Sequence, residues 1–162
     1  MARRRAVRLA WALSSLAWLS GCAPPPPHRP KADRRALLLV LLDGSGYKAF
    51  VGPSIVVAHT KDRVVWEVKD QTGKDLEVEI AGLQYVGPSP CPTPSASSRE
   101  DDPFEEKTKK KEFKREQKDR ELPLTVRQAA EGCYAYKVKV TVKDGAASTE
   151  VEANDPQVDI WK

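Results

Sequence analysis

The sequence predicts an all-β domain built as a two-layer sandwich, and three observations carry this prediction. Short segments in which apolar and polar residues alternate recur through most of the chain after residue 36. Turn-forming residues separate these segments, most clearly at Asp144-Gly145, a pair typical of β-hairpins. The chain has 162 residues, which is enough for one ordinary domain and too few for two. Roughly seven or eight short strands with such turns are typical of a β-sandwich.

The chain opens with a segment that has the three parts of a secretory signal. Four arginines lie among the first eight residues, and an apolar stretch follows at 9–19. This stretch is shorter than the ~20 residues needed to span a bilayer. It ends in Leu19-Ser20-Gly21-Cys22, in which two small residues precede a cysteine.

This ending resembles the lipobox of bacterial lipoproteins. The resemblance implies that residues 1–21 are a removable signal peptide and that Cys22 carries acyl chains such as palmitate, which anchor the protein in a membrane. Each buried CH₂ group of such a chain contributes about 0.8 kcal/mol. In the family, Asp after the cysteine favours the inner membrane, so Ala23 implies the outer membrane, facing the periplasm. An uncleaved anchor is the alternative.

Residues 22–36 are expected to form a Pro-rich tether, and residues 37–162 the domain. Four consecutive prolines at 24–27 favour polyproline II, a semi-rigid spacer that extends about 3.1 Å per residue. A proline-rich recognition motif is the alternative.

The formal net charge of +4 belongs to the leader. Four of the 27 basic residues and none of the 23 acidic residues lie in 1–21, so the rest of the chain is formally neutral. No overall positive field remains to attract a nucleic acid, and we expect no nucleic-acid partner.

Strands are expected along the domain in the following order: 36–42, 47–51, 55–59, 63–69, 76–80, 134–143, 148–153 and 158–161. The continuous apolar run at 36–42 suits a strand buried on both faces or one fixed at the start of a domain. The later strands alternate, which indicates one buried face. A turn is expected at 43–46, and a hairpin-like loop at 70–74.

Residues 87–121 differ from the rest and are expected to form a surface insertion, flexible or partly helical. Four prolines and four serines occupy 87–98, and nine basic and nine acidic residues follow in 99–121. Glu105 and Lys109 stand at helical spacing, a pair that contributes only about 0.2–0.5 kcal/mol. The lysine cluster at 107–111 could contact an anionic partner, but a solvated charge run is the favoured interpretation.

Two cysteines remain once Cys22 is lipidated, and the exported location favours a disulfide between Cys91 and Cys133. The bridge closes about 42 residues and contributes roughly 4 kcal/mol in the chain-entropy model. A redox role is disfavoured because no Cys-x-x-Cys spacing is present.

Two patterns that can carry chemistry occur near the first turn. Residues 44–49 formally match G-x-G-x-x-A, but Gly52-Pro53 stops the helix that phosphate binding requires, so a turn is favoured. Asp43, Ser45 and His59 are the residue types of a hydrolase triad, yet Ser45 lacks the G-x-S-x-G elbow. We therefore predict no catalytic residue.

The segments 51–57, 64–68 and 134–138, with Asp155-Pro156 before the last strand, resemble cupredoxin-like domains. The resemblance implies a Greek-key β-sandwich, and an immunoglobulin-like sandwich is the alternative. Blue-copper members use two His, a Cys and often a Met as ligands. The matching positions here hold no His, and the only Met is Met1, so we expect a cupredoxin-like domain without copper or any other cofactor.

These observations predict a lipid-anchored protein of the bacterial cell envelope with a non-catalytic binding or structural role. Its partners are expected to be the membrane and an envelope protein or polymer. The alternatives are a metal-handling or electron-transfer cupredoxin and a small envelope hydrolase that uses Ser45 and His59.

Overall fold

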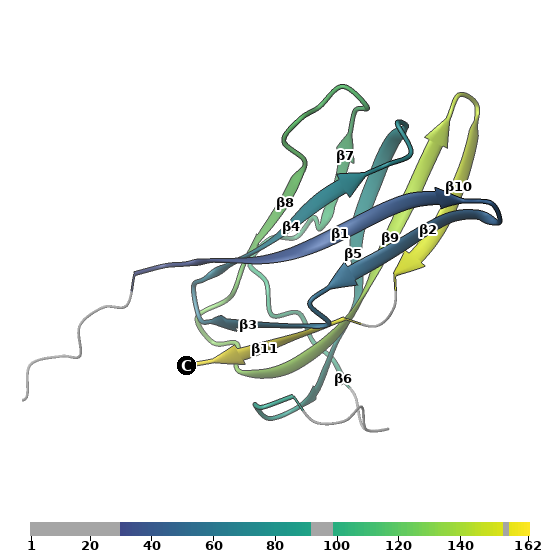
Figure 1. Ribbon diagram of the computed structural model, residues 1–162. Coiled ribbons are helices and arrows are strands. Elements are labelled where there is room, and N and C mark those ends of the chain that lie inside the picture. Colours follow the sequence, from purple (N-terminus) through teal and green to yellow (C-terminus); the bar gives the residue numbers. More distant parts are fainter. Residues whose placement is uncertain (1–29, 92–98, 154–155) are drawn as a thin grey trace, which may run out of the picture.

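The computed structural model describes residues 30–91, 99–153 and 156–162, and these form an all-β fold of two sheets packed face to face (Figure 1). The predicted signal peptide, Cys22 and most of the predicted tether lie outside the described residues. In the described part, no helix is long and apolar enough to cross a membrane.

The first sheet has four strands in the order β2-β1-β4-β8. These are β1 (Asp33–Asp43), β2 (Gly46–Gly52), β4 (Arg63–Asp70) and β8 (Glu121–Thr125). The neighbours β1 and β4 run parallel, whereas β1–β2 and β4–β8 are antiparallel. Residues 44–45 close the β1–β2 hairpin, which confirms the turn expected there.

The second sheet has seven strands and is built around the long pair β5 and β9. Its members are β3 (Ile55–His59), β5 (Asp75–Gly87), β6 (Arg99–Glu100), β7 (Lys110–Phe113), β9 (Gly132–Asp144), β10 (Ala147–Ala153) and β11 (Gln157–Trp161). The hairpin expected at Asp144-Gly145 joins β9 to β10. The last strand, β11, pairs antiparallel with β9 and parallel with β3.

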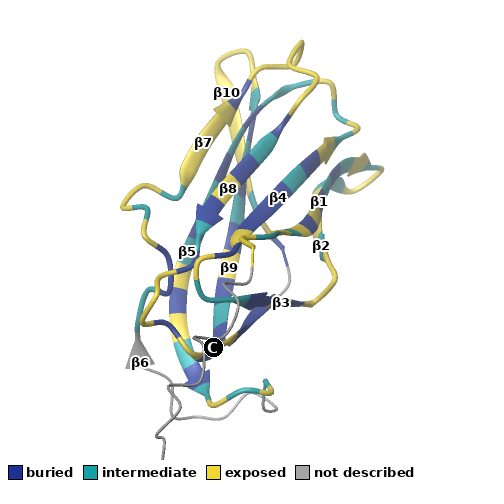
Figure 2. Cartoon of the chain, turned by 90° about the vertical axis from the view of Figure 1, so that its left-hand side faces the viewer, coloured by how far each residue is buried: buried dark blue, intermediate teal, exposed yellow. Residues whose placement is uncertain are grey.

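The core lies between the two sheets, and buried residues alternate with exposed ones along most strands (Figure 2). Trp66 is central: its ring meets Tyr136 edge-on at 5.6 Å, and its Nε1 donates a hydrogen bond of 3.1 Å to the Tyr136 hydroxyl. Burial raises the pKa of Tyr136, although this hydrogen bond opposes the shift. Both polar groups are therefore satisfied inside an apolar core, as buried Trp and Tyr require.

The strand β1 is the first strand of the domain and is fully buried on one face only, so of the two expectations for the apolar run, burial on both faces is wrong. Leu38 and Val40 point into the core, whereas Leu37 on the outer face is 43% exposed and Leu39 and Leu41 are half-buried. The strand also begins at Asp33, four residues before the expected start of the domain. Only one face of this sheet packs on the other sheet, so the continuous apolar run is longer than the core requires.

The loop at 70–74 is not a hairpin. The strand before it, β4, pairs with β1 and β8, and the strand after it, β5, pairs with β9 and β7. The loop therefore crosses from one sheet to the other. Alternation shows only that each strand has one buried face, and it does not reveal which sheet that strand joins.

The segment 99–121 is not helical. Its described residues form β6, β7 and irregular connections, and β7 pairs with β5. Phe104 and Phe113 are fully buried, and the Phe104 ring meets Trp66 edge-on at 5.7 Å. The two phenylalanines fix this charged segment to the core because burying each ring stabilises far more than the surface ion pairs do. Residues 92–98 lie outside the described residues.

Candidate functional site

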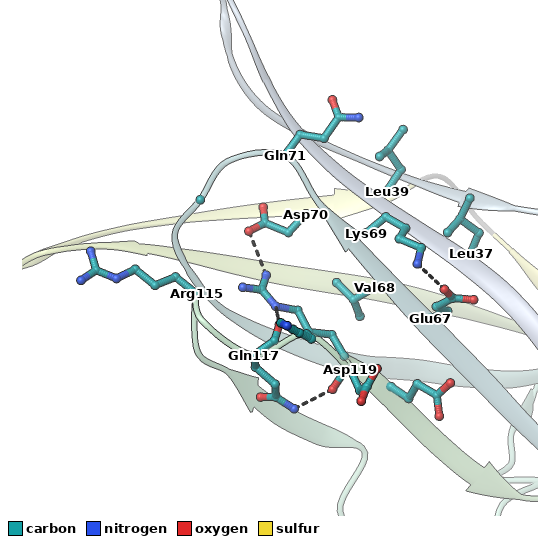
Figure 3. Close-up of a pocket in the computed structure, with 14 residues that line it drawn as sticks. Leu37, Leu39, Glu67, Val68, Lys69, Asp70, Gln71, Arg115, Gln117 and Asp119 are labelled. Carbon is teal, nitrogen blue, oxygen red and sulfur yellow. Dashed lines mark hydrogen bonds and ion pairs between the residues drawn. The ribbon is translucent and has the colours of Figure 1, made fainter.

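A groove of about 610 Å³ runs along the outer face of the first sheet (Figure 3). Leu37 and Leu39 from β1 and Glu67 and Lys69 from β4 line one side, and Arg115 and residues 117–121 line the other. Parallel pairing brings Leu37 opposite Glu67 and Leu39 opposite Lys69. We call this feature the groove: it has an apolar strip on one side and charged walls.

Arg120 holds the outer wall of the groove in place. Its Nη1 donates a hydrogen bond of 2.8 Å to Asp70, and both side chains are almost fully buried, at 6% and 5% exposed. The same guanidinium donates to the carbonyl oxygens of Lys114 and Gln117. One side chain therefore ties the turn at 114–117 to the end of β4.

Two further ion pairs lie on this face. Lys69 pairs with Glu67 on the same strand, and Arg35 on β1 lies 2.6 Å from Glu121 on β8. The hydrogen bond from Lys69 lowers the pKa of Glu67, and the hydrogen bond to Glu121 raises the pKa of Arg35. These acids and bases stay charged at neutral pH, so the arrangement suits recognition of a polar partner better than proton transfer.

The lysine cluster at 107–111 is largely engaged inside the molecule. Lys109 pairs with Asp102, Lys110 lies 2.6 Å from Glu77, and Lys111 donates to the carbonyl oxygen of Glu121. The Lys111 ammonium also lies 5.4 Å from the centre of the Phe113 ring. Lys109 and Lys111 therefore make contacts within the segment 99–121, and Lys110 ties the segment to β5.

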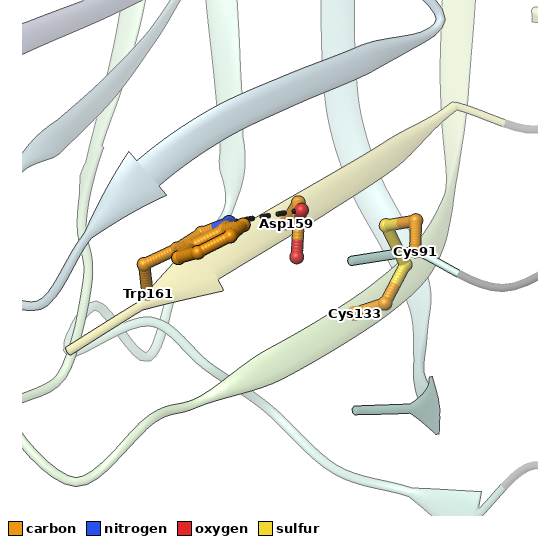
Figure 4. The surroundings of a disulfide bond; sticks show 4 residues. All are labelled: Cys91, Cys133, Asp159 and Trp161. Atoms are coloured by element: carbon orange, nitrogen blue, oxygen red, sulfur yellow. Dashed lines mark hydrogen bonds between the residues drawn. A yellow bond between two sulfur atoms is a disulfide. The ribbon is translucent and has the colours of Figure 1, made fainter. Parts of the chain in front are cut away.

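Cys91 and Cys133 form the expected disulfide (Figure 4). Cys133 lies on β9 beside Gly132, whose φ of +105° suits only glycine. A Cβ at Gly132 would lie 2.6 Å from the Tyr85 ring and 2.7 Å from the carbonyl oxygen of Gly87. Glycine at this position lets β5 and β9 approach closely next to the bridge. Cys22 lies outside the described residues.

The residue types of a hydrolase triad are not brought together. Asp43 accepts hydrogen bonds from Ser45 in the β1–β2 turn, whereas His59 ends β3 beside Asp62. These two places lie at opposite ends of β1. Asp43 ends this strand, whereas Asp33 at its start pairs with Arg63, which directly follows Asp62. At about 3.3 Å per residue, the eleven residues of β1 separate the Asp43 turn from His59 by roughly 35 Å.

Within the described ranges, no three His, Cys, Asp or Glu side chains gather at a spacing that could hold a metal ion.

No known protein family matches the chain, and no curated protein matches it either. The fold and the groove thus define a two-sheet β-sandwich with a charge-paired surface site.

Sequence reasoning missed Arg120 and the groove. The alternation of Leu122, Leu124 and Val126 continues backward to Arg120, which therefore shares their buried face. When a charged residue falls at a position whose alternating neighbours are all buried, that residue is expected to have a partner of opposite charge that is buried with it.

Proposed function

We propose that the protein is a lipid-anchored lipoprotein of the bacterial envelope whose sandwich binds an envelope protein or polymer without catalysis. The observation that carries the binding role is the groove, in which the exposed Leu37 and the half-buried Leu39 lie beside ion pairs. Such a surface offers apolar contact and orientation, and it offers no nucleophile next to a base.

The anchor is supported by the sequence Leu19-Ser20-Gly21-Cys22 and by the prolines that follow it. Mass analysis of the N-terminal peptide of the purified protein tests it. We expect cleavage before Cys22 and an acylated cysteine, and Cys22→Ser should abolish acylation. Ala23→Asp should move the protein from the outer to the inner membrane fraction.

For the architecture we propose a cupredoxin-like topology. The parallel pairs β1–β4 and β3–β11 support it, because the immunoglobulin-like sandwich is built from antiparallel sheets. Electron transfer at a blue-copper site is not part of the proposal. The Cys133 sulfur is bonded to Cys91 and so supplies no thiolate.

In-cell photo-crosslinking tests the binding role. A photoreactive residue replaces Lys118, which lines the groove and makes no ion pair with any described residue. The matched control replaces Thr149, an exposed residue of β10 on the other sheet. We expect a discrete adduct from position 118 only. Equal labelling from both positions, or none from either, contradicts the proposal.

A further inference from the structure

A second apolar surface lies on the opposite sheet, at the corner formed by β3 and β11. Ile55, Val57 and Trp161 are 41%, 51% and 45% exposed. In the parallel register, Val57 lies opposite Asp159, and His59 lies opposite Trp161. Because Val56, Ala58, Val158 and Ile160 point into the core, the three exposed residues share the outer face. We call these three residues the β3–β11 corner.

The Trp161 ring is held in position with its polar edge satisfied. Its Nε1 donates a hydrogen bond of 3.0 Å to Asp159, which is itself buried (Figure 4). The ring is therefore fixed while much of its apolar surface stays open. An amphipathic ring of this kind is the group that proteins place at the boundary between headgroups and acyl chains.

The start of β1 is tied to this corner by the buried carboxylate of Asp62. It accepts hydrogen bonds from the backbone N–H of Ala32 at 3.0 Å and from that of His59 at 3.1 Å. Thr60, which follows His59 in the chain, donates its N–H to the carbonyl oxygen of Trp161. The chain thus leaves the sandwich toward its N-terminus beside the corner, at the same end as the C-terminus (Figure 1).

The tether is short relative to the domain. Pro30 follows Cys22 by eight positions, and these eight steps span at most about 29 Å when the chain is fully extended. The strand β1 alone, with eleven residues, extends over roughly 35 Å. A lipid on Cys22 therefore keeps this end of the domain close to the membrane surface.

The charges at this end favour an anionic surface. Lys31 and Lys61 are exposed, and neither makes an ion pair with any described residue. Three nearby acids are in ion pairs: Asp33 with Arg63, Asp62 with Arg34 and Glu131 with Lys162. Asp159 forms no ion pair with any described residue, but it is buried and accepts the hydrogen bond from Trp161. The exposed groups without an ion pair are thus Lys31 and Lys61, and they complement lipid phosphates.

We propose that the β3–β11 corner rests on an anionic phospholipid bilayer, with the Trp161 ring among the headgroups and Lys31 and Lys61 against the phosphates. This inference depends on the proposed acylation of Cys22 and adds an orientation to it. It leaves the groove, on the other sheet, facing away from the corner and accessible to a partner.

Tryptophan fluorescence of the purified acylated protein tests the proposal. The protein is incorporated into vesicles of phosphatidylethanolamine and phosphatidylglycerol, with or without brominated acyl chains that quench nearby indoles. Outside the leader the only tryptophans are Trp66, in the core, and Trp161. We expect brominated lipid to remove about half of the emission, because only Trp161 reaches the interface. In Trp161→Phe this loss should disappear.

Matched variants separate the corner from apolar exposure in general. Val57→Ser should reduce the quenching of Trp161 at least about twofold, whereas Leu37→Ser, a similar change on the other sheet, should leave it unchanged. Equal quenching in vesicles of phosphatidylcholine alone would overturn the role of Lys31 and Lys61. An acylated protein without quenching overturns this inference and leaves the anchor standing. An unacylated Cys22 overturns both.

Discussion

The groove and the β3–β11 corner both expose apolar side chains, yet their surroundings differ. Leu37 and Leu39 lie among charges that are paired with each other, and a buried ion pair holds the far wall. In the corner, the paired strands β3 and β11 present Val57 and Trp161, and the exposed charges without an ion pair are Lys31 and Lys61 at its edge. A surface with paired charges of both signs suits a partner of fixed shape, whereas an apolar patch edged by lysines suits a fluid anionic surface.

Removing Arg120 should have the largest effect, because the groove depends on it and the corner does not. Arg120→Ala leaves Asp70 as a buried carboxylate without its cationic partner, with only the hydrogen bonds from Thr72, which costs about 3–5 kcal/mol. Urea denaturation measures this loss. Arg115→Ala is the control, since the Arg115 side chain is exposed and forms an ion pair with its neighbour Glu116, so its removal should cost far less. Similar losses in both variants would show that the wall is not fixed by Arg120.

The disulfide next to the corner gives the second effect. Replacing Cys91 and Cys133 together by Ser opens a loop of 42 residues, and the chain-entropy model assigns about 4 kcal/mol to its closure. Thermal unfolding with and without reductant measures this. The wild-type protein should be destabilised by reductant, and the double variant should not respond. A wild-type melting temperature that ignores the reductant would contradict a structural role for the bridge.

Asp62 gives a smaller effect that depends on pH. Burial alone would raise the pKa of Asp62, but the hydrogen bonds from Ala32, Arg34 and His59 outweigh it and hold the pKa below its ordinary value. The folded state therefore resists protonation more than the unfolded state does. The stability that Asp62 contributes is fully present above the ordinary carboxyl pKa of about 3.9 and is lost as the pH falls through the lower, folded value.

Asp62→Asn should therefore lower stability by about 2 kcal/mol at pH 7, because the amide nitrogen faces the donors of Arg34 and His59. The deficit should shrink as the pH is lowered below about 4. Denaturation at a series of pH values measures this, with Asp33→Asn as control. The Asp33 carboxylate is more exposed and should contribute less than about 1 kcal/mol. A deficit independent of pH would mean that the charge of Asp62 is not involved.

The strands that alternate in isolation were predictable from sequence, and those that depend on distant partners were not. Apolar and polar residues alternate over 134–143, and this segment lies within β9. By contrast, β7 contains Lys110, Lys111 and Glu112, so its sequence gives no sign that it pairs with β5. Only Phe104 and Phe113 mark this segment as part of the core, and two apolar residues nine positions apart define no period.

The candidate site was predictable in part for a similar reason. The pairing of Cys91 with Cys133 follows from counting cysteines in a chain that the sequence predicts to be exported. The groove needs the parallel register of β1 and β4 and the contact of Arg120 with Asp70, fifty residues apart. Sequence gives no register between strands that are distant along the chain, so this juxtaposition could not be anticipated.

The two variants with the smallest expected effect on stability should distinguish the groove from the corner most clearly. Leu37→Ser and Val57→Ser each change an exposed side chain, and the stability of either variant should stay within about 0.5 kcal/mol of the wild type. Their functions should diverge, because Leu37 lines the groove and Val57 lies in the corner. Leu37→Ser should weaken the crosslink from position 118 and leave Trp161 quenching intact, and Val57→Ser should do the reverse. If one variant weakens both signals, the groove and the corner act as a single surface, and the partner then contacts the protein only at the membrane.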